Sequence, residues 1–211
     1  MTTIFPITLH CPICKTKFGS NEIGSCGYAS KRADFRPNYW GMNPVYYFYH
    51  LCPECGYCGS RNTFEFEIND EKLREKVEAL ESLKDPSLST KLERAMNCLE
   101  LLNDHGILKL TEFDLGNRWI EFFWWSEEDN AKIPGETVIK YFKQSLEKDL
   151  VPEDEISTIK YLIGEISRRI GNREQAKAYF EEVISSTVKE EFIHELAVRQ
   201  NANPQDNLKS T

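Results

Sequence analysis

Four cysteines of the chain form two Cys-Pro-x-Cys motifs, Cys11 to Cys14 and Cys52 to Cys55. Two cysteines separated by two residues can place both sulfurs about 2.3 Å from one metal ion, because the turn between them curls around it. One such turn supplies half of a tetrahedral site, and two turns complete it. Proline restricts the backbone of each turn, and Gly56 supplies a permissive conformation after the second. The spacing therefore predicts a metal site built from Cys11, Cys14, Cys52 and Cys55.

Four thiolates in a tetrahedral arrangement bind zinc or iron. One zinc ion per chain is the predicted cofactor, because nothing in the sequence indicates an electron-transfer surface, and a rubredoxin-like iron is the alternative. Cys58 extends the second motif, but the fourth Cys-Pro member of an iron–sulfur run is missing. Four thiolates close the coordination sphere, and no Ser/His/Asp or Cys/His arrangement stands out, so the expected role is structural and not enzymatic.

Other residues with ligand chemistry lie near the motifs or on helical patterns. His10 and His50 flank the two turns; strand packing is the predicted role of both, and contact with the metal site is the alternative. Cys58 and Cys98 are expected to be buried thiols. Cys26 has no partner at ligand spacing.

Short strands must hold the two motifs in place. Ile4–His10 runs into the first motif and Val45–Leu51 into the second, and the alternation over Asn62–Glu67 predicts a strand that pairs back. A zinc ribbon contains two units of this kind, each with a strand, a Cys-Pro-x-Cys turn and a second strand. The 37 residues between Cys14 and Cys52 exceed the usual ribbon spacing, so this segment is expected to fold as an insertion.

The insertion contains a run of basic and aromatic residues between Lys31 and Pro44. Such a run could bind a nucleic-acid strand or a phosphate-bearing ligand. The preferred interpretation is a structured loop whose aromatic residues cover the metal site and whose Asp34 and Arg36 form an ion pair. One basic cluster is weak evidence for nucleic-acid binding in a protein with a net charge of −8, so nucleic acid is not the predicted partner. The candidate ligand residues of this loop are Arg32, Asp34, Arg36, Tyr39, Trp40 and Asn43.

Charge and cysteine content divide the 211-residue chain. Residues 1–62 carry a net charge of +3 and the remainder −11, and six of the seven cysteines lie before residue 60. The predicted division is a zinc-ribbon-like module over 1–67, a helical domain over 68–200 and a disordered tail over 201–211. No apolar run approaches the length of a membrane span and no signal-peptide pattern is present, so a cytoplasmic protein with reduced thiols is expected.

The region after residue 68 shows helical periodicity. Apolar residues recur at helical spacing over Glu71–Lys84 and over Ser89–Asn103, which predicts two amphipathic helices. Further on, the chain resembles itself at an offset of 38 residues. This offset predicts two helical hairpins, 117–127 with 135–147 and 155–170 with 173–186.

The repeat is strongest in the second helix of each hairpin. The offset aligns Phe142 with Phe180, and on the preceding helices it aligns Ser126 with Gly164. The second hairpin resembles a tetratricopeptide repeat, through Gly164 on its first helix and Ala176-x3-Phe180 on its second. Repeats of this kind are scaffolds more often than catalytic sites.

The complete pattern of motifs resembles an uncharacterised prokaryotic family, a domain of unknown function, over roughly residues 8–186. That family joins an N-terminal double Cys-Pro-x-Cys segment to a C-terminal tetratricopeptide-like tail. Two positions depart from its pattern: Lys15, where such a turn usually has glycine, and Cys58, where a small residue other than cysteine is expected. The resemblance implies no activity. It rests on Cys11-Pro12-x-Cys14, Asp34-x2-Pro37-x-Tyr39-x-Gly41-x-Asn43-Pro44, Cys52-Pro53-x-Cys55-Gly56-Tyr57 and the stretch from Tyr161 to Asn172.

The sequence thus predicts an α+β protein, with a small β module that binds metal followed by an array of helical hairpins. The expected function is that of a zinc-binding adaptor whose helices bind another protein or a second copy of the chain. A nucleic-acid-binding module is the alternative. An enzyme and a rubredoxin-like redox protein are less favoured alternatives.

Overall fold

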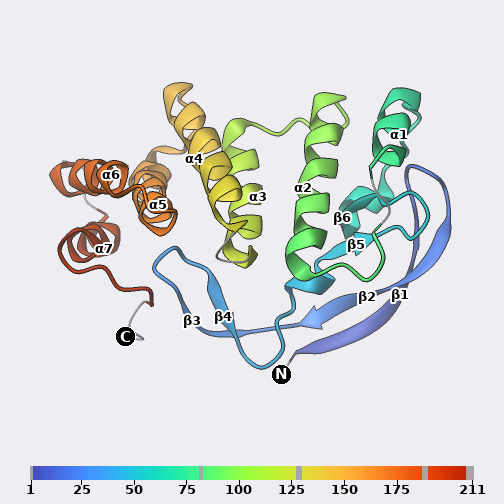
Figure 1. Cartoon of the computed structure of the whole chain (residues 1–211), viewed down its shortest axis with the longest axis horizontal. Helices are drawn as coiled ribbons and strands as arrows, with labels where there is room; N and C mark the ends of the chain where they lie inside the picture. Colours follow the sequence, from blue (N-terminus) through green and yellow to red (C-terminus); the bar gives the residue numbers. More distant parts are fainter. Residues whose placement is uncertain (1, 81–82, 127–129, 187–189, 208–211) are drawn as a thin grey trace. The chain divides into compact units, whose positions relative to one another are not determined.

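The computed structural model of this protein describes residues 2–80, 83–126, 130–186 and 190–207. The chain forms two compact units: the first contains Met1–Ala29 and Tyr39–Lys109, and the second contains Ser30–Asn38 and Leu110–Thr211. Antiparallel strand pairs lie in the N-terminal part and helices follow, so the predicted α+β class is confirmed (Figure 1). Among the described helices, none combines the length and the apolar character needed to cross a membrane.

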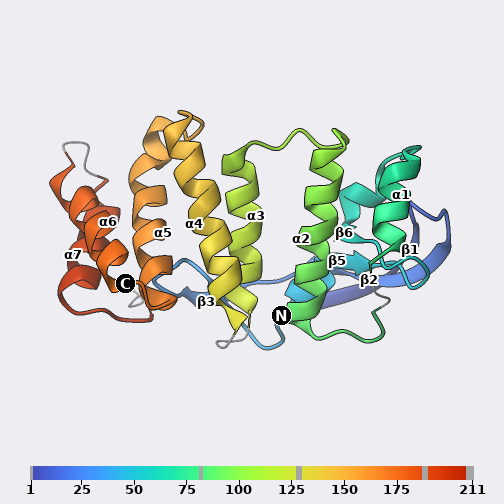
Figure 2. The same cartoon turned by 45° about the horizontal axis from the view of Figure 1, so that its top comes forward.

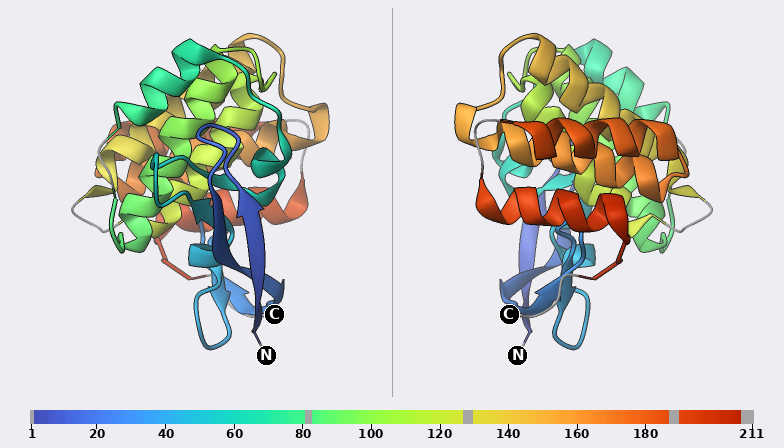
Figure 3. Two further views of the ribbon diagram at one scale, coloured as in Figure 1. Left: turned by 90° about the vertical axis from the view of Figure 1, so that its right-hand side faces the viewer. Right: turned by 90° about the vertical axis from the view of Figure 1, so that its left-hand side faces the viewer.

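Two strand pairs of the first unit turn at the cysteine motifs. Strand β1 (Thr3–His10) pairs with β2 (Lys17–Ser25) in a long two-stranded ribbon (Figure 3), and β5 (Tyr49–Leu51) pairs with β6 (Cys58–Ser60). The predicted strand over Ile4–His10 is therefore confirmed, as is the strand, turn, strand order on both sides. A third pair, β3 (Tyr28–Lys31) with β4 (Pro37–Tyr39), lies in the insertion.

The strand predicted over Val45–Leu51 is only half right. Its second half forms β5, but Val45–Tyr47 forms a short 3-10 helix. The Val45 N–H donates to the side-chain oxygen of Asn43 (3.1 Å), and this bond favours a turn over extended backbone.

The strand predicted over Asn62–Glu67 is wrong. Arg61–Glu65 is a 3-10 helix in which the Thr63 hydroxyl donates to the Ser60 carbonyl (2.8 Å). Of the two phenylalanines that produce the alternation, Phe64 is buried within this 3-10 helix and Phe66, half-buried, follows it. The strand that pairs back on β5 is β6, which the sequence analysis did not identify.

Two helices complete the first unit. Asp70 caps α1 (Glu71–Glu78) and Ser87 caps α2 (Leu88–Asp104), each by accepting a backbone N–H of the first turn. Helix α2 packs on β5 and β6 through side chains that are fully buried. The first unit therefore extends to Lys109, beyond the composition boundary near residue 67. The fully buried residues of α2 include Leu92, Met96, Cys98 and Leu102.

The second unit is built from five helices among its described residues, and they lie side by side in sequence order (Figure 2). Neighbours in sequence pack on one another, so the two predicted hairpins are confirmed, and the last helix also packs on α5. The helices are α3 (Glu112–Trp125), α4 (Lys132–Glu147), α5 (Ile156–Arg169), α6 (Arg173–Ser185) and α7 (Glu191–Ala202).

In each hairpin, a glycine of the first helix packs against a phenylalanine ring of the second helix. A Cβ atom at Gly164 would lie 2.8 Å from the Phe180 ring, and one at Gly116 would lie 2.5 Å from the Phe142 ring. The counterpart of Gly164 is therefore Gly116, and the predicted alignment with Ser126 is wrong. The offset of 38 fails for α3 because Gly116 and Phe142 are 26 residues apart in the sequence, whereas Gly164 and Phe180 are 16 apart.

The chain end expected to be disordered is hydrogen-bonded over its described part. The Ala33 N–H donates to the Asp206 carbonyl (2.9 Å), and the Gln205 N–H donates to the Gln200 side chain (2.7 Å). Arg32 and Asn207 form an isolated antiparallel bridge. Residues 208–211 of the predicted tail lie outside the described residues.

Candidate metal centre

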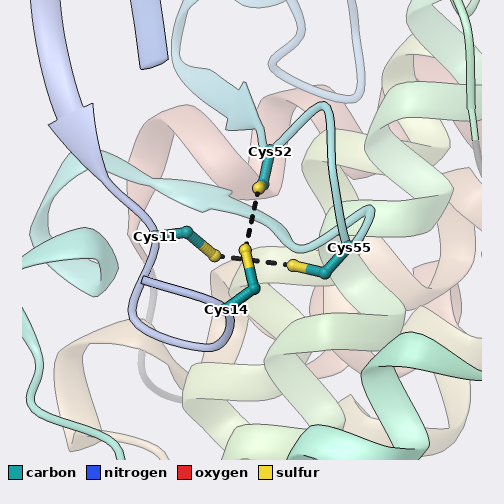
Figure 4. A group of neighbouring side chains, drawn as sticks. All are labelled: Cys11, Cys14, Cys52 and Cys55. Carbon is teal, nitrogen blue, oxygen red and sulfur yellow. Dashed lines mark hydrogen bonds between the residues drawn. The ribbon is translucent and has the colours of Figure 1, made fainter. Parts of the chain in front are cut away.

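The four predicted cysteines converge in the first unit (Figure 4). Their sulfurs all lie within 4.8 Å of one another; those of Cys11 and Cys55 are 3.5 Å apart, and those of Cys14 and Cys52 are 3.6 Å apart. Thiolates arranged tetrahedrally about 2.3 Å from one ion have sulfur–sulfur distances of about 3.8 Å. The observed spacing therefore fits one tetrahedral metal ion, and the donor set of four sulfurs suits zinc or iron.

The two turns present their sulfurs through the same backbone geometry. In each turn, the N–H of the first cysteine donates to the carbonyl five residues later, and its carbonyl accepts the N–H four residues later. These bonds close the turn around the sulfurs, and each turn continues directly into a paired strand. The bonds are Cys11 N to Thr16 O (2.9 Å), Lys15 N to Cys11 O (3.0 Å), Cys52 N to Tyr57 O (2.8 Å) and Gly56 N to Cys52 O (3.1 Å).

Lys15 and Gly56 occupy the same position in the two turns. Both have a left-handed backbone, with φ of +64° at Lys15 and +71° at Gly56. Glycine adopts this conformation without strain, whereas a residue with a Cβ atom does not. The Lys15 ammonium donates to the Pro12 carbonyl (2.8 Å) and the Ile68 carbonyl (3.2 Å). These bonds explain how lysine is accommodated at a position typical of glycine.

Replacement of Lys15 should separate the backbone strain from the side-chain bonds. Lys15→Ala loses both hydrogen bonds and keeps the strain, whereas Lys15→Gly loses the bonds and relieves the strain. Lys15→Ala should therefore be less stable than Lys15→Gly by about 1 kcal/mol, measured by denaturant unfolding of the metal-loaded protein. Equal stability of the two variants would contradict the backbone argument.

The proton distribution among the thiols shows why a cation suits this site. Hydrogen bonds from the Cys11 and Cys55 thiols lower the pKa of Cys52, and the same sharing raises the pKa of Cys11 and of Cys55. Four thiolates this close repel one another, so without a cation some must keep their protons. A divalent ion favours the thiolate form of all four and binds in exchange for protons.

The histidines near the turns do not join the cluster. His50 is fully buried, its Nδ1 lies 2.9 Å from the Ser20 hydroxyl, and its ring packs edge-on against Phe64. Burial lowers the pKa of His50 to about 4, so the ring is neutral. His10 is exposed. The packing role predicted for His50 agrees with these contacts.

The other cysteines lie apart from the four-sulfur cluster. Cys58 and Cys98 are buried; the Cys58 N–H donates to the Cys98 sulfur (3.4 Å), and the Cys58 thiol donates to the Lys91 carbonyl (3.6 Å). Burial raises the pKa of Cys98 to about 11, and it also raises the pKa of Cys58. Both are therefore neutral packing residues. Cys26 is exposed.

The candidate ligand loop divides between the two units. In the second unit, Arg32 and Asp34 form a two-bond ion pair, with one N–O distance of 3.0 Å. The predicted Asp34–Arg36 pair is wrong: Arg36 offers Asp34 only its backbone N–H (3.3 Å). Its guanidinium instead donates to the Trp124 carbonyl (3.2 Å) and lies over the Trp125 ring.

The remaining loop residues belong to the first unit. Trp40 is 58% exposed, and its ring packs close to Gly27. The Asn43 side chain accepts the Val45 N–H, and Tyr39, which is half-buried, is the last residue of β4. The six candidate residues are therefore divided between the two units, three in each.

Charged residues that the sequence analysis did not select surround Asp34 in the second unit. Arg169 lies 3.5 Å from the Asp34 carboxylate, and Glu165 binds both Arg168 and Arg169. The adjacent arginines Arg168 and Arg169 at the end of α5 were the sequence feature that could have indicated this charged cluster. The role of Asp34 depends on residues far along the chain, so the loop sequence alone could not reveal it.

These features define an α+β protein with a four-cysteine candidate metal site in its N-terminal part and a helical C-terminal region. The model of the family described as "Uncharacterized protein conserved in bacteria (DUF2225)" matches residues 4–203. The chain belongs to this bacterial family, as its motifs indicated. Comparison with curated proteins and with solved structures gives no significant match.

Proposed function

We propose that this protein is a zinc-binding adaptor of the bacterial cytoplasm and not an enzyme. Zinc holds the first unit together, and the helical unit binds an acidic, amphipathic segment of another protein. The observation that carries this proposal is a groove along α4, α5 and α6 with apolar residues in its lining and a surplus of lysines in one of its two clefts. The four-sulfur cluster supports the metal part of the proposal.

A closed thiolate site favours a structural metal over a catalytic one. Catalytic zinc keeps a coordination position open for water or substrate, whereas four cysteines complete the tetrahedron. Cys11 and Cys52 are each only 1% exposed, whereas Cys14 and Cys55 are half-buried. Zinc is preferred to iron because it needs no redox partner surface to serve this role.

The groove consists of two adjoining clefts that share Lys143. The first, about 660 Å³, lies between α4 and the turn that joins α5 to α6. Its floor contains Ile139 and Ile170, and the second cleft adds Leu146, Ile156 and Tyr179. Apolar floors of this kind suit the apolar side chains of a bound peptide.

The charge of the groove indicates which peptide it fits. The first cleft is lined by Lys132, Lys140 and Lys143 against the single carboxylate of Glu136. The second cleft is balanced, because Lys143 and Lys160 face Glu147 and Glu182, so the positive surplus lies in the first cleft. Opposite charges steer association and select partners, so this surplus favours an acidic segment. A segment with apolar and acidic residues in alternation along one face would use both the floor and the lysines.

Charge reversal in the groove should abolish partner binding. We expect tagged wild-type protein, purified from its native cells, to enrich a partner that the double variant Lys140→Glu, Lys143→Glu enriches at least about tenfold less. Quantitative mass spectrometry measures the ratio, with metal content and circular dichroism as folding checks. The matched control is Arg118→Glu, an exposed charge reversal on α3 outside the groove.

Two outcomes would contradict the groove proposal. One is an enrichment profile that is the same for the groove variant and for Arg118→Glu. The other is self-association: if the enriched species is the chain itself and light scattering shows a dimer that the groove variant loses, the groove binds a second copy.

A further inference from the structure

A cleft of about 280 Å³ in the second unit is lined by three arginines. It lies where the tip of the inserted hairpin, residues 30–38, meets the ends of α3 and α5 within this unit. Two aromatic side chains form part of its wall, and one carboxylate stands at its rim. The lining residues are Arg32, Phe123, Trp124, Ser126, Ala131, Arg168, Arg169 and Asp206.

Two buried carboxylates hold the arginines in position. Glu165, fully buried, accepts two bonds from Arg168 (2.9 and 2.8 Å) and one from Arg169 (2.8 Å). Asp34, also fully buried, pairs with Arg32 and lies 3.5 Å from Arg169. The guanidinium groups are only 14–21% exposed, so their orientation is set before any ligand binds.

The cluster has more positive than buried negative charge. Arg36 is the fourth arginine of this region, and its Nε is buried without a hydrogen-bond partner. Burial, together with the charge of Arg32, lowers the pKa of Arg36, which is consistent with a local surplus of positive charge. Among the described residues of this region, four arginines therefore stand against two buried carboxylates and the exposed carboxylate of Asp206.

Asp206 supplies this exposed carboxylate from the end of the described chain. Its carboxylate lies 3.0 Å from Arg168 Nη2 and 3.6 Å from Arg169 Nη2, yet it is 71% exposed. Asp206 therefore contacts the arginines from the solvent side, as far as the described residues show. An external oxyanion could take the same donors.

We propose that this cleft binds a phosphate group and that Asp206 occupies its place in the absence of ligand. Guanidinium groups bind phosphate by paired hydrogen bonds, and a phosphate offers more acceptor oxygens and more charge than one carboxylate. The group is either free phosphate or the phosphate of a small ester whose remainder packs on Phe123 and Trp124. This function is separate from the adaptor proposal, because the groove residues take no part in it.

The decisive variant is Asp206→Asn, which removes the competing charge and retains the size of the side chain. Titration calorimetry with inorganic phosphate, at an ionic strength held constant with chloride, should give about threefold to tenfold tighter binding than wild type. Asp154→Asn, an exposed acid in the same unit, should bind phosphate like wild type. A purely structural role for Asp206 predicts lower stability and no gain in phosphate binding.

Arg168→Gln should weaken phosphate binding at least about tenfold, with circular dichroism to verify folding. A parallel titration with phenyl phosphate distinguishes the two sources. Tighter binding than that of inorganic phosphate supports an aromatic ester, and equal binding supports free phosphate. Unchanged or weaker phosphate binding by Asp206→Asn, or undiminished binding by folded Arg168→Gln, would overturn the proposal.

Discussion

Removal of the metal should unfold the first unit and leave the helices of the second unit folded. We expect one zinc per purified chain, and we expect a chelator to abolish the protection of backbone amides in β5, β6 and α2 from hydrogen exchange. Binding of structural zinc contributes about 10–16 kcal/mol, as much as the entire stability of a typical domain. Amides of α5 and α6 should keep their protection, because their packing partners lie in the second unit.

Single cysteine variants provide the controls for this result. Replacement of Cys11, Cys14, Cys52 or Cys55 by serine should reproduce the loss of metal and of amide protection. Cys26→Ser is the matched control, because Cys26 is exposed and lies outside the cluster. Retention of the N-terminal fold after chelation would show that the metal is not structural, and a coloured protein containing iron would replace zinc with the rubredoxin-like alternative.

The second large effect concerns the glycine–phenylalanine contacts of the helical hairpins. Phe142 is fully buried against Gly116, and Phe180 is 2% exposed against Gly164. Replacement of either ring by alanine should lower the free energy of unfolding by about 3–5 kcal/mol, because the cavity beside a glycine has no side chain to fill it. Denaturant unfolding followed by circular dichroism measures the loss.

Phe192 offers a control of the same residue type. It lies on α7 and is 52% exposed, so Phe192→Ala should change stability by about 0.5 kcal/mol or less. If Phe142→Ala and Phe180→Ala were as mild as Phe192→Ala, the two rings would not be equivalent core positions, and the internal repeat would lose its physical basis.

The four cysteines could be predicted because their chemistry is local. A Cys-Pro-x-Cys turn places two sulfurs on one side of the backbone whatever the rest of the chain does, and two such turns need only to meet. The helices could be predicted for a similar reason, since one apolar face per turn of helix is visible in the sequence. The resemblance to the family rested on the same motifs and is confirmed over residues 4–203.

The failures have other causes, and the contacts of Asp34 show one of them: distant residues decide the local structure. Asp34 pairs with Arg32 and Arg169 because the tip of the hairpin folds into the helical unit, and no property of the loop indicates α5 as its neighbour. The offset of 38 failed at α3 because the two hairpins share a glycine–phenylalanine contact but differ in the sequence spacing of the two residues, which is 26 in the first hairpin and 16 in the second. The strand predicted over Asn62–Glu67 failed because a local hydrogen bond from Thr63 to Ser60 favours a 3-10 turn, which the alternation of residue types does not reveal.

The membership of residues 30–38 in the second unit has a consequence for the order of events during synthesis. The Tyr161 hydroxyl donates to the Ala33 carbonyl (2.8 Å) across 128 residues of sequence. A ribosome that adds about 5–20 residues per second completes the first unit, through Lys109, seconds before α5 emerges. The metal can therefore bind while Asp34 and Ala33 are still hydrated. The later helices then pack on residues 30–38 and bury them. A fragment that begins at residue 110 would lack this strand segment and leave the buried Tyr161 hydroxyl without its acceptor.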